Sequence, residues 1–287
     1  MFITSLNPMN STMDNRIPFV MLTILLMAGG CMPGCITPAR GEEIRVAAAW
    51  MDDAKTDLLN FDLAAEDLKN ETIKLLSARS KYENAVQTLD TITPMSDSEK
   101  QEIAVLRKIC VYNLITIDGM EQYAKAIRDA ALSREYENKR VYTGAQMEVR
   151  SAASEAKRAL EAFTKALAAD RQIRESGYVP QDELSRYIAG WEAIHPGAIN
   201  ELLVYTIEVD PLFRADDRYF WAEMLVARGE EYRARNVLGS AAADFSEAKS
   251  VFRAARQMYG DIAAGNGNYS AVARDAMNSC DSWISRL

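Results

Sequence analysis

The residue types that most often perform catalysis are sparse and scattered in this chain. His195 is the single histidine, and it stands before Pro196 in a segment expected to be a loop. A zinc site needs several such ligands, and no Ser or Cys near His195 in sequence suggests a nucleophile for it to activate. His195 is therefore expected to cap the following helix rather than to act as a base.

Acidic residues occur in adjacent pairs, at Asp52-Asp53, Asp216-Asp217 and Glu230-Glu231. Neighbouring residues on a helix point about 100° apart, so such a pair does not converge on one reacting centre. These pairs are expected on solvated helix faces. Gly265-Asn266-Gly267 lacks the rest of a phosphate loop, and the residues around it lack calcium-loop spacing. The sequence predicts no enzyme, metal site or cofactor.

Cys110 and Cys280 fall on apolar faces of expected helices. Buried free thiols are the usual state of such residues, whereas an oxidising compartment would allow the two to pair and close a long loop. Both readings stay open, because the sequence gives no distance between them. Asn70 and Asn268 each begin an Asn-x-Ser/Thr triplet, which matters only where exported proteins are glycosylated.

Aromatic residues gather between positions 187 and 232. Tyr219, Phe220 and Trp221 are consecutive, so on one helix they cannot all face a single core. Protein interfaces favour Tyr, Trp and Arg. Packing between helices is the alternative role for this cluster. The candidate partner-binding residues are Tyr187, Trp191, Arg218, Tyr219 and Trp221.

The elements that must position these residues are predicted to be helices. Four of the eight prolines precede residue 41, and the stretches 41–93, 95–179 and 212–287 contain none. Ala, Glu, Lys, Arg, Leu and Met dominate these stretches and are the residues that enter a helix at least cost. Apolar residues recur every three or four positions through Phe163 and through Phe252. The fold class is predicted to be all-α, an antiparallel array of about nine or ten helices.

Several boundaries can be placed from local signals. The segment Ser96–Glu99 has capping-box spacing and is expected to open a helix after Pro94. Gly265–Gly267 is expected to be the turn before the last helix. The segment Ile109–Ile117 is rich in β-branched residues, yet a lone strand would have no partner, so a buried helix is predicted.

Proline and glycine mark further expected helix ends. Gly177 and Pro180 are expected to close the long helix that carries Phe163, and a boundary between two subdomains is expected near 177–182. Pro211 is expected to end one helix, with Asp216-Asp217 beginning the next.

The N-terminal segment has the composition of an export signal. Ile17–Met27 is almost wholly apolar, and Ala28-Gly29-Gly30-Cys31 follows it. This order resembles a prokaryotic lipoprotein signal, although Ala28 stands where that family usually has leucine. The resemblance implies cleavage before Cys31 and attachment of membrane lipid to its thiol. An uncleaved transmembrane anchor is the alternative, because residues 17–39 carry no charge; a plain cleaved signal is another.

This interpretation divides the chain into three parts. Residues 1–30 form the signal, with Met13 as an alternative start, residues 31–43 form the lipid-attachment site and tether, and residues 44–287 form the exported body. Cleavage of a lipoprotein signal, or retention of the anchor, leaves the body on the extracytoplasmic face of the cell membrane.

Three places in the body resemble the second helix of a tetratricopeptide hairpin. Ala159-x3-Phe163-x2-Ala166 and Ala248-x3-Phe252-x2-Ala255 match the small–large–small pattern, and the segment 82–89 matches it less well. The first-helix signature of that family is not found at the expected offset, and the triplets do not recur at its repeat length. Degenerate tetratricopeptide-like hairpins and a generic helical array both stay open.

Charge narrows the choice of partner. The formal net charge is −8 and the pI is near 5.0. A nucleic-acid backbone would repel such a surface, so nucleic-acid binding is not expected. The sequence favours a non-catalytic protein-binding, peptide-binding or scaffold module, with a small-solute-binding or sensor domain as the alternative.

Overall fold

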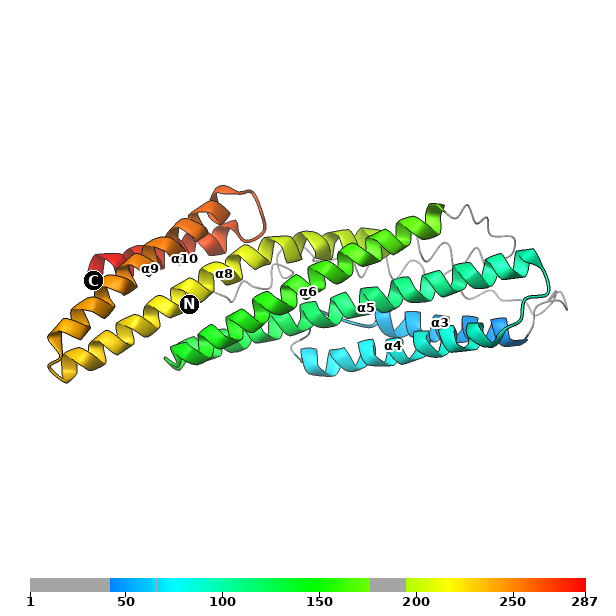
Figure 1. Ribbon diagram of the computed structural model, residues 1–287, viewed down its shortest axis with the longest axis horizontal. Coiled ribbons are helices and arrows are strands. Elements are labelled where there is room, and N and C mark those ends of the chain that lie inside the picture. The colour runs from blue at the N-terminus through cyan, green and yellow to red at the C-terminus, as the bar shows by residue number, and fades with distance from the viewer. Residues whose placement is uncertain (1–41, 64, 66, 176–194) are drawn as a thin grey trace. The chain divides into compact units, whose positions relative to one another are not determined.

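The computed structural model describes residues 42–63, 65, 67–175 and 195–287 (Figure 1). These residues form seven α-helices and no strand, which confirms the all-α class. The prediction of nine or ten helices refers to the whole chain and stays a prediction. The signal, the tether with Cys31 and the expected boundary near 177–182 lie outside the described residues. No described helix is both long and apolar enough to cross a membrane.

Helices α3 to α6 follow one another through short connections, and so do helices α8 to α10 (Figure 1). The three longest have 42, 40 and 34 residues. Helix α3 packs against α4, and α9 packs against α10. The bounds are α3 (Glu42–Leu59), α4 (Leu68–Thr91), α5 (Asp97–Asn138), α6 (Tyr142–Glu175), α8 (His195–Ala234), α9 (Leu238–Ala264) and α10 (Ser270–Arg286).

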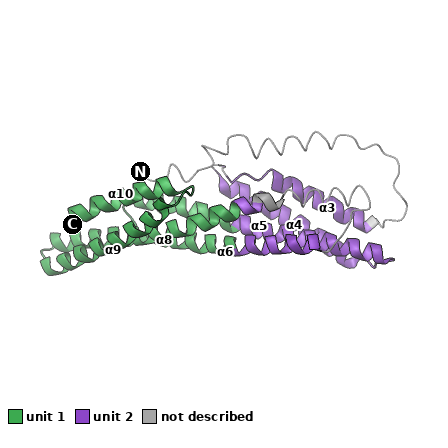
Figure 2. Ribbon diagram, turned by 90° about the horizontal axis from the view of Figure 1, so that it is seen from above, with its two compact units in different colours: residues 1–7, 122–160, 202–287 green, residues 8–121, 161–201 purple. Residues whose placement is uncertain are grey.

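The chain divides into two compact units (Figure 2). The described part of unit 1 comprises residues 122–160 and 202–287, and that of unit 2 comprises residues below 122 together with 161–175 and 195–201. Each unit has its own core of fully buried side chains. That of unit 1 includes Phe220, Phe252 and Tyr259, and that of unit 2 includes Tyr82, Tyr112 and Phe163.

Two local predictions are confirmed at the ends of helices. The Glu99 N–H donates to Ser96 Oγ over 3.2 Å, and Glu99 Oε2 accepts at 2.7 Å from the N–H of Met95, the residue before the cap, so Ser96 and Glu99 together cap the start of α5. Residues 265–269 join α9 to α10, as the Gly265–Gly267 turn predicts. The β-branched segment 109–117 is helical, and Ile109 and Ile117 are buried in α5.

The predicted helix end at Pro211 is wrong, because α8 continues through it. A proline inside a helix costs about 3 kcal/mol through a lost hydrogen bond and a clash with the preceding turn. Val209, Leu212 and Phe213 are all buried around it, and burying each is worth about 1.5–3 kcal/mol. Packing of this face therefore outweighs the local cost. Asp216-Asp217 lies within α8 and does not begin a helix.

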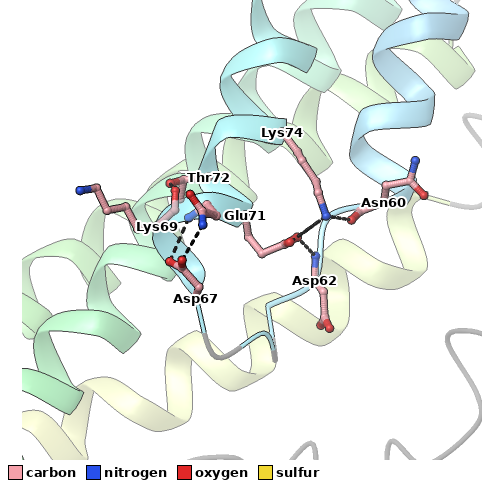
Figure 3. A network of polar contacts seen from close by, with 8 residues as sticks. Asn60, Asp62, Asp67, Lys69, Glu71, Thr72 and Lys74 are labelled. Carbon is pink, nitrogen blue, oxygen red and sulfur yellow. Dashed lines mark hydrogen bonds and ion pairs between the residues drawn. The ribbon is translucent and has the colours of Figure 1, made fainter.

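A polar network holds the connection between α3 and α4 (Figure 3). The Glu71 carboxylate accepts from the Asp62 N–H at 2.8 Å, and Lys74 Nζ donates to Glu71 Oε1 and to the Asn60 carbonyl, each at 2.7 Å. The hydrogen bond from Lys74 is the largest cause that lowers the pKa of Glu71. These groups satisfy one another and the backbone of the connection, so their role is structural.

The α5–α6 and α8–α9 hairpins are closed by two turns of the same type. Arg140 and Asn236 have φ of 59° and 61°, and each is the second residue after the end of its helix. The Val141 N–H donates to the Tyr136 carbonyl and the Val237 N–H to the Tyr232 carbonyl, both at 2.9 Å. This pattern is a Schellman motif with a left-handed residue at the C′ position.

The sequence around the two turns is also related. Glu135-Tyr136, Val141 and Ala145 recur as Glu231-Tyr232, Val237 and Ala241, a shift of 96 residues (138 to 234 at the helix ends). The same shift pairs buried positions of the second helices, such as Ala152 with Ala248 and Ala156 with Phe252. The two alanine–phenylalanine triplets that resemble tetratricopeptide helices are therefore not at equivalent positions of this repeat.

Replacing Arg140 with glycine is expected to raise the free energy of unfolding by about 0.5–1 kcal/mol, because an L side chain is strained at φ of 59°. Asn236→Gly should gain less, since asparagine tolerates this conformation better. Urea denaturation measures both. Lys139→Gly, one residue earlier, is the control and should destabilise. An equal gain at Lys139 would contradict the assignment of the strain to Arg140.

Gly119 in α5 lies directly beneath the ring of Phe163 in α6, within unit 2. A Cβ on Gly119 would overlap this ring, which is fully buried. Gly119→Ala is expected to lower the free energy of unfolding by about 1–3 kcal/mol despite the better helix propensity of alanine. Thermal or urea denaturation measures this loss.

Gly260→Ala in α9 is the matched control. A Cβ there would meet only Met277 Sδ at 3.6 Å, an ordinary contact. The gain in helix propensity should then stabilise the protein by up to about 1 kcal/mol. If Gly119→Ala and Gly260→Ala both stabilise or both destabilise the protein, the close crossing at Gly119 is refuted.

Candidate functional site

Unit 1 holds a cluster of ionisable groups, which we call the buried charge cluster: Asp216, Glu223 and Tyr259, which are buried, and Arg134 and Glu137, which are half-buried. Arg134 Nη2 lies 2.9 Å from Asp216 Oδ2, and the Tyr259 hydroxyl donates to Asp216 Oδ1 over 2.5 Å. Burial raises the pKa of Asp216, and the Arg134 guanidinium partly opposes that rise. Burial alone would lower the pKa of Arg134, but the negative charges of Asp216 and Glu137 act together with smaller contributions, and the pKa is raised.

Glu223 is another carboxyl group of this cluster whose pKa is raised. Glu223 is 6% exposed, and its Oε2 has no hydrogen-bond partner among the described residues. Burial, and then the charge of Glu137, raise the pKa of Glu223 to about 8. Hydrogen bonds with Tyr219 and Trp283 oppose this rise only in part.

A carboxyl group that titrates near pH 8 has the acidity of a general acid or base. Catalysis would also require substrate access, and none of the cluster's residues lines either of the two surface hollows described below. The contacts of the cluster join α5, α8 and α9 within unit 1, and they contribute to the stability of that unit.

The expectation that Asp216 lies on a solvated face is wrong. Val209, Phe213, Asp216, Phe220 and Glu223 follow one another at intervals of four, three, four and three, so they share one face of α8. That face is buried, and Arg134 of α5 neutralises the carboxylate within it. The heptad-like spacing was the signal in the sequence. Asp217, one residue on, points away and pairs with Arg150 at 2.7 Å.

A first surface hollow of about 560 Å³, the acidic hollow, lies in unit 1. Its apolar lining includes Met258 and Ile262, and its charged lining is Glu208, Asp210, Asp261 and Arg214. Arg214 pairs with Asp210 at 2.9 Å. Glu208 Oε2 accepts from the Asn268 N–H at 3.1 Å, which fixes the α9–α10 connection. Asp261 is exposed and has no ion-pair partner in the described part of the chain.

A second hollow of about 340 Å³, the basic hollow, shares Arg214 and Met258 with the first. Arg150 and Arg218 complete its basic lining, and Phe213 contributes apolar surface. Arg218 is exposed and, within the described residues, has no ion-pair partner. Three guanidinium groups from two helices, α6 and α8, thus surround an apolar surface beside a single carboxylate, Asp217. This arrangement suits an anionic group with apolar neighbours.

The structure places the predicted partner-binding residues in different surroundings. Tyr219 is half-buried, packs edge-on against Phe252 at 5.5 Å between ring centroids, and accepts from Trp283 Nε1 at 3.3 Å. It is therefore a packing residue between α8, α9 and α10. Trp221 is half-buried, whereas Arg218 is exposed in the basic hollow. Tyr187 and Trp191 lie outside the described residues.

The remaining candidates take ordinary structural states. Cys110 and Cys280 are buried free thiols, and burial raises the pKa of each to about 12; their pairing stays a prediction. The sequon side chains are engaged, because Asn70 Nδ2 donates to Asp67 at 2.6 Å and Asn268 Nδ2 to Glu208 at 2.9 Å. His195 is the first residue of α8, and its side chain is outside the description.

Arg214 and Arg150 were not among the candidates drawn from the sequence. They lie 64 positions apart, and nothing local relates them (150 to 214). Among the described residues, no group of three or more His, Cys, Asp or Glu residues is placed to hold a metal ion.

No protein-family model, curated protein or solved structure matches this chain.

Proposed function

We propose that this chain is a membrane-anchored, extracytoplasmic helical-repeat protein that binds a protein or peptide without catalysing a reaction. The observation that carries this proposal is the pair of adjoining hollows on unit 1, with opposite charges and shared apolar surface. Interfaces combine an apolar centre with charged groups that set orientation and specificity. The related α5–α6 and α8–α9 hairpins support a helical-repeat architecture with a repeat longer than the tetratricopeptide unit.

The anchor is assigned to Cys31, with lipid on its thiol, because Ala28-Gly29-Gly30 precedes it after an apolar run. Mass spectrometry of the mature N-terminus should detect an acylated Cys31, and Cys31→Ala should release the protein from membranes. Cys35→Ala is the matched control and should leave attachment unchanged. An intact N-terminus in the membrane fraction would instead support the transmembrane anchor.

Binding can be tested with the full chain in detergent. Arg214 lines both hollows, so Arg214→Glu is expected to weaken retention of a partner from membrane extracts. Arg253→Glu is the matched control, because Arg253 is exposed on α9 and lines neither hollow. Equal retention by the wild-type chain and both variants would remove this surface as the binding site.

The second candidate function is binding of a small solute. It is favoured by one observation, the acidic hollow of about 560 Å³, a volume within the range of small-molecule sites. A thermal-shift screen against amino acids, sugars and cationic solutes tests it, since a ligand of the native state raises stability. A solute that shifts the wild-type chain but not an Asp261→Asn variant would favour this function over peptide binding.

A further inference from the structure

An exposed stripe runs along α8 in unit 1, beginning before the hollows and continuing into them. Its five residues, which we call the α8 stripe, are Val204, Ile207, Pro211, Arg214 and Arg218, and all are exposed. They follow one another at intervals of three, four, three and four, so they share one face of the helix. Pro211 and Arg214 line the acidic hollow, and Arg214 and Arg218 line the basic hollow.

The stripe changes character along its length. Val204 is 50% exposed and Ile207 is 52% exposed, so the first half leaves branched apolar side chains in water. The second half carries two guanidinium groups, of which Arg218 has no ion-pair partner within the described residues. The stripe spans 14 helical steps (204 to 218), about 21 Å along the axis.

Helix spacing on the stripe identifies the form of its occupant. A second helix repeats its own side chains at intervals of three and four, so it can match every position of the stripe. An extended peptide repeats every two residues and cannot match these positions in the same way. The guanidinium groups of Arg214 and Arg218 pair with carboxylates, so the occupant is expected to carry acidic residues opposite them.

We infer that the α8 stripe docks an amphipathic helix of a partner protein. The apolar residues of that helix cover Val204, Ile207 and Pro211, and its acidic residues face Arg214 and Arg218 in the basic hollow. This inference rests on the proposed binding function and names the class of partner. Arg218 is then the residue that favours an acidic over a basic helix, because Arg214 is already paired with Asp210.

The test uses two conformationally constrained helices of about 21 residues, a length that covers the stripe. Both carry three leucines along one face. The acidic probe continues that face with two glutamates, and the basic probe continues it with two lysines. Binding of each labelled probe to the full chain in detergent is followed by fluorescence anisotropy. The wild-type chain is expected to bind the acidic probe at least about fivefold more tightly, as expected for one exposed ion pair.

Arg218→Glu is expected to weaken binding of the acidic probe and to strengthen binding of the basic probe, each by about fivefold. A folding defect would weaken both and could not invert the preference. Ile207→Asp should weaken both probes, and Arg253→Glu on α9 should change neither. An unchanged preference in Arg218→Glu would overturn the inference.

Other occupants give different results. If Ile207→Asp dissociates a dimer of the wild-type chain in sedimentation experiments, the stripe binds a second copy and the partner-helix inference is wrong. If neither probe binds but Arg214→Glu still lowers retention from membrane extracts, the helix inference fails while the proposed binding function stands. If neither probe binds and Arg214→Glu retains the partner unchanged, both fail.

Discussion

Replacing Arg134 with methionine is expected to lower the free energy of unfolding by about 3–5 kcal/mol, because it leaves the buried carboxylate of Asp216 without its counter-charge. The Asp216 side chain is 5% exposed and lies 2.9 Å from Arg134. Tyr259 would still donate to Asp216, but a single neutral hydrogen bond does not replace the ion pair. Urea denaturation at neutral pH measures the loss.

The double variant Arg134→Met/Asp216→Asn separates loss of the pair from loss of packing. Asparagine keeps the shape of aspartate and can accept from Tyr259 without carrying a charge. Most of the lost stability should then return, as it does when both partners of a buried pair become neutral. A double variant as unstable as the sum of the two single variants would show that the cost arises from packing instead.

Glu223 should make the protein lose stability as the pH rises from about 4.5 to about 8. The pKa of Glu223 is raised from its ordinary value of 4.5 to about 8 in the fold, so between these values the native state holds a proton that the unfolded chain has released. Unfolding then releases that proton, and stability falls with rising pH. The contribution of Glu223 to stability is fully present below about pH 4.5 and is lost above about pH 8. Its size is about 5 kcal/mol, because each pH unit between the two values corresponds to about 1.4 kcal/mol.

Glu223→Gln should remove most of this pH dependence, since glutamine resembles the protonated acid. Urea denaturation at pH 5 and above pH 8 compares the variant with the wild-type chain. Both chains should carry His195→Gln, which removes the single histidine of the sequence. Glu247→Gln is the control on the exposed surface of α9. If Glu223→Gln retains the wild-type pH slope, Glu223 does not hold a proton in the fold.

Arg134 and Glu223 belong to the same cluster, so substitution of one affects the pKa of the other. Glu137 raises the pKa of Glu223, while Arg134 lowers it. Removing Arg134 should therefore raise the pKa of Glu223 further and extend the loss of stability to higher pH. The buried charge cluster thus combines three carboxyl groups with one guanidinium in the core of unit 1, and its stability depends on which carboxyl groups hold a proton.

The likeness of the two hairpin turns is present in the sequence, but the sequence patterns considered above do not predict it. A search at the tetratricopeptide length cannot detect a shift of 96 residues (138 to 234). Glu135-Tyr136 and Val141 do recur as Glu231-Tyr232 and Val237, but short matches of this kind carry little weight alone. The left-handed residues Arg140 and Asn236 give the matches a common physical cause.

The sequence by itself determined the helices, because the controlling forces are local. The scarcity of proline, the three-and-four spacing of apolar residues, the Ser96–Glu99 capping box and the Gly265–Gly267 turn each act within a few positions. Only the tertiary structure decided that α8 passes through Pro211 and that Asp216 is buried against Arg134. It also brought Arg150 beside Arg214. These outcomes depend on contacts between residues far apart in the chain, whose packing energy exceeds the local preferences.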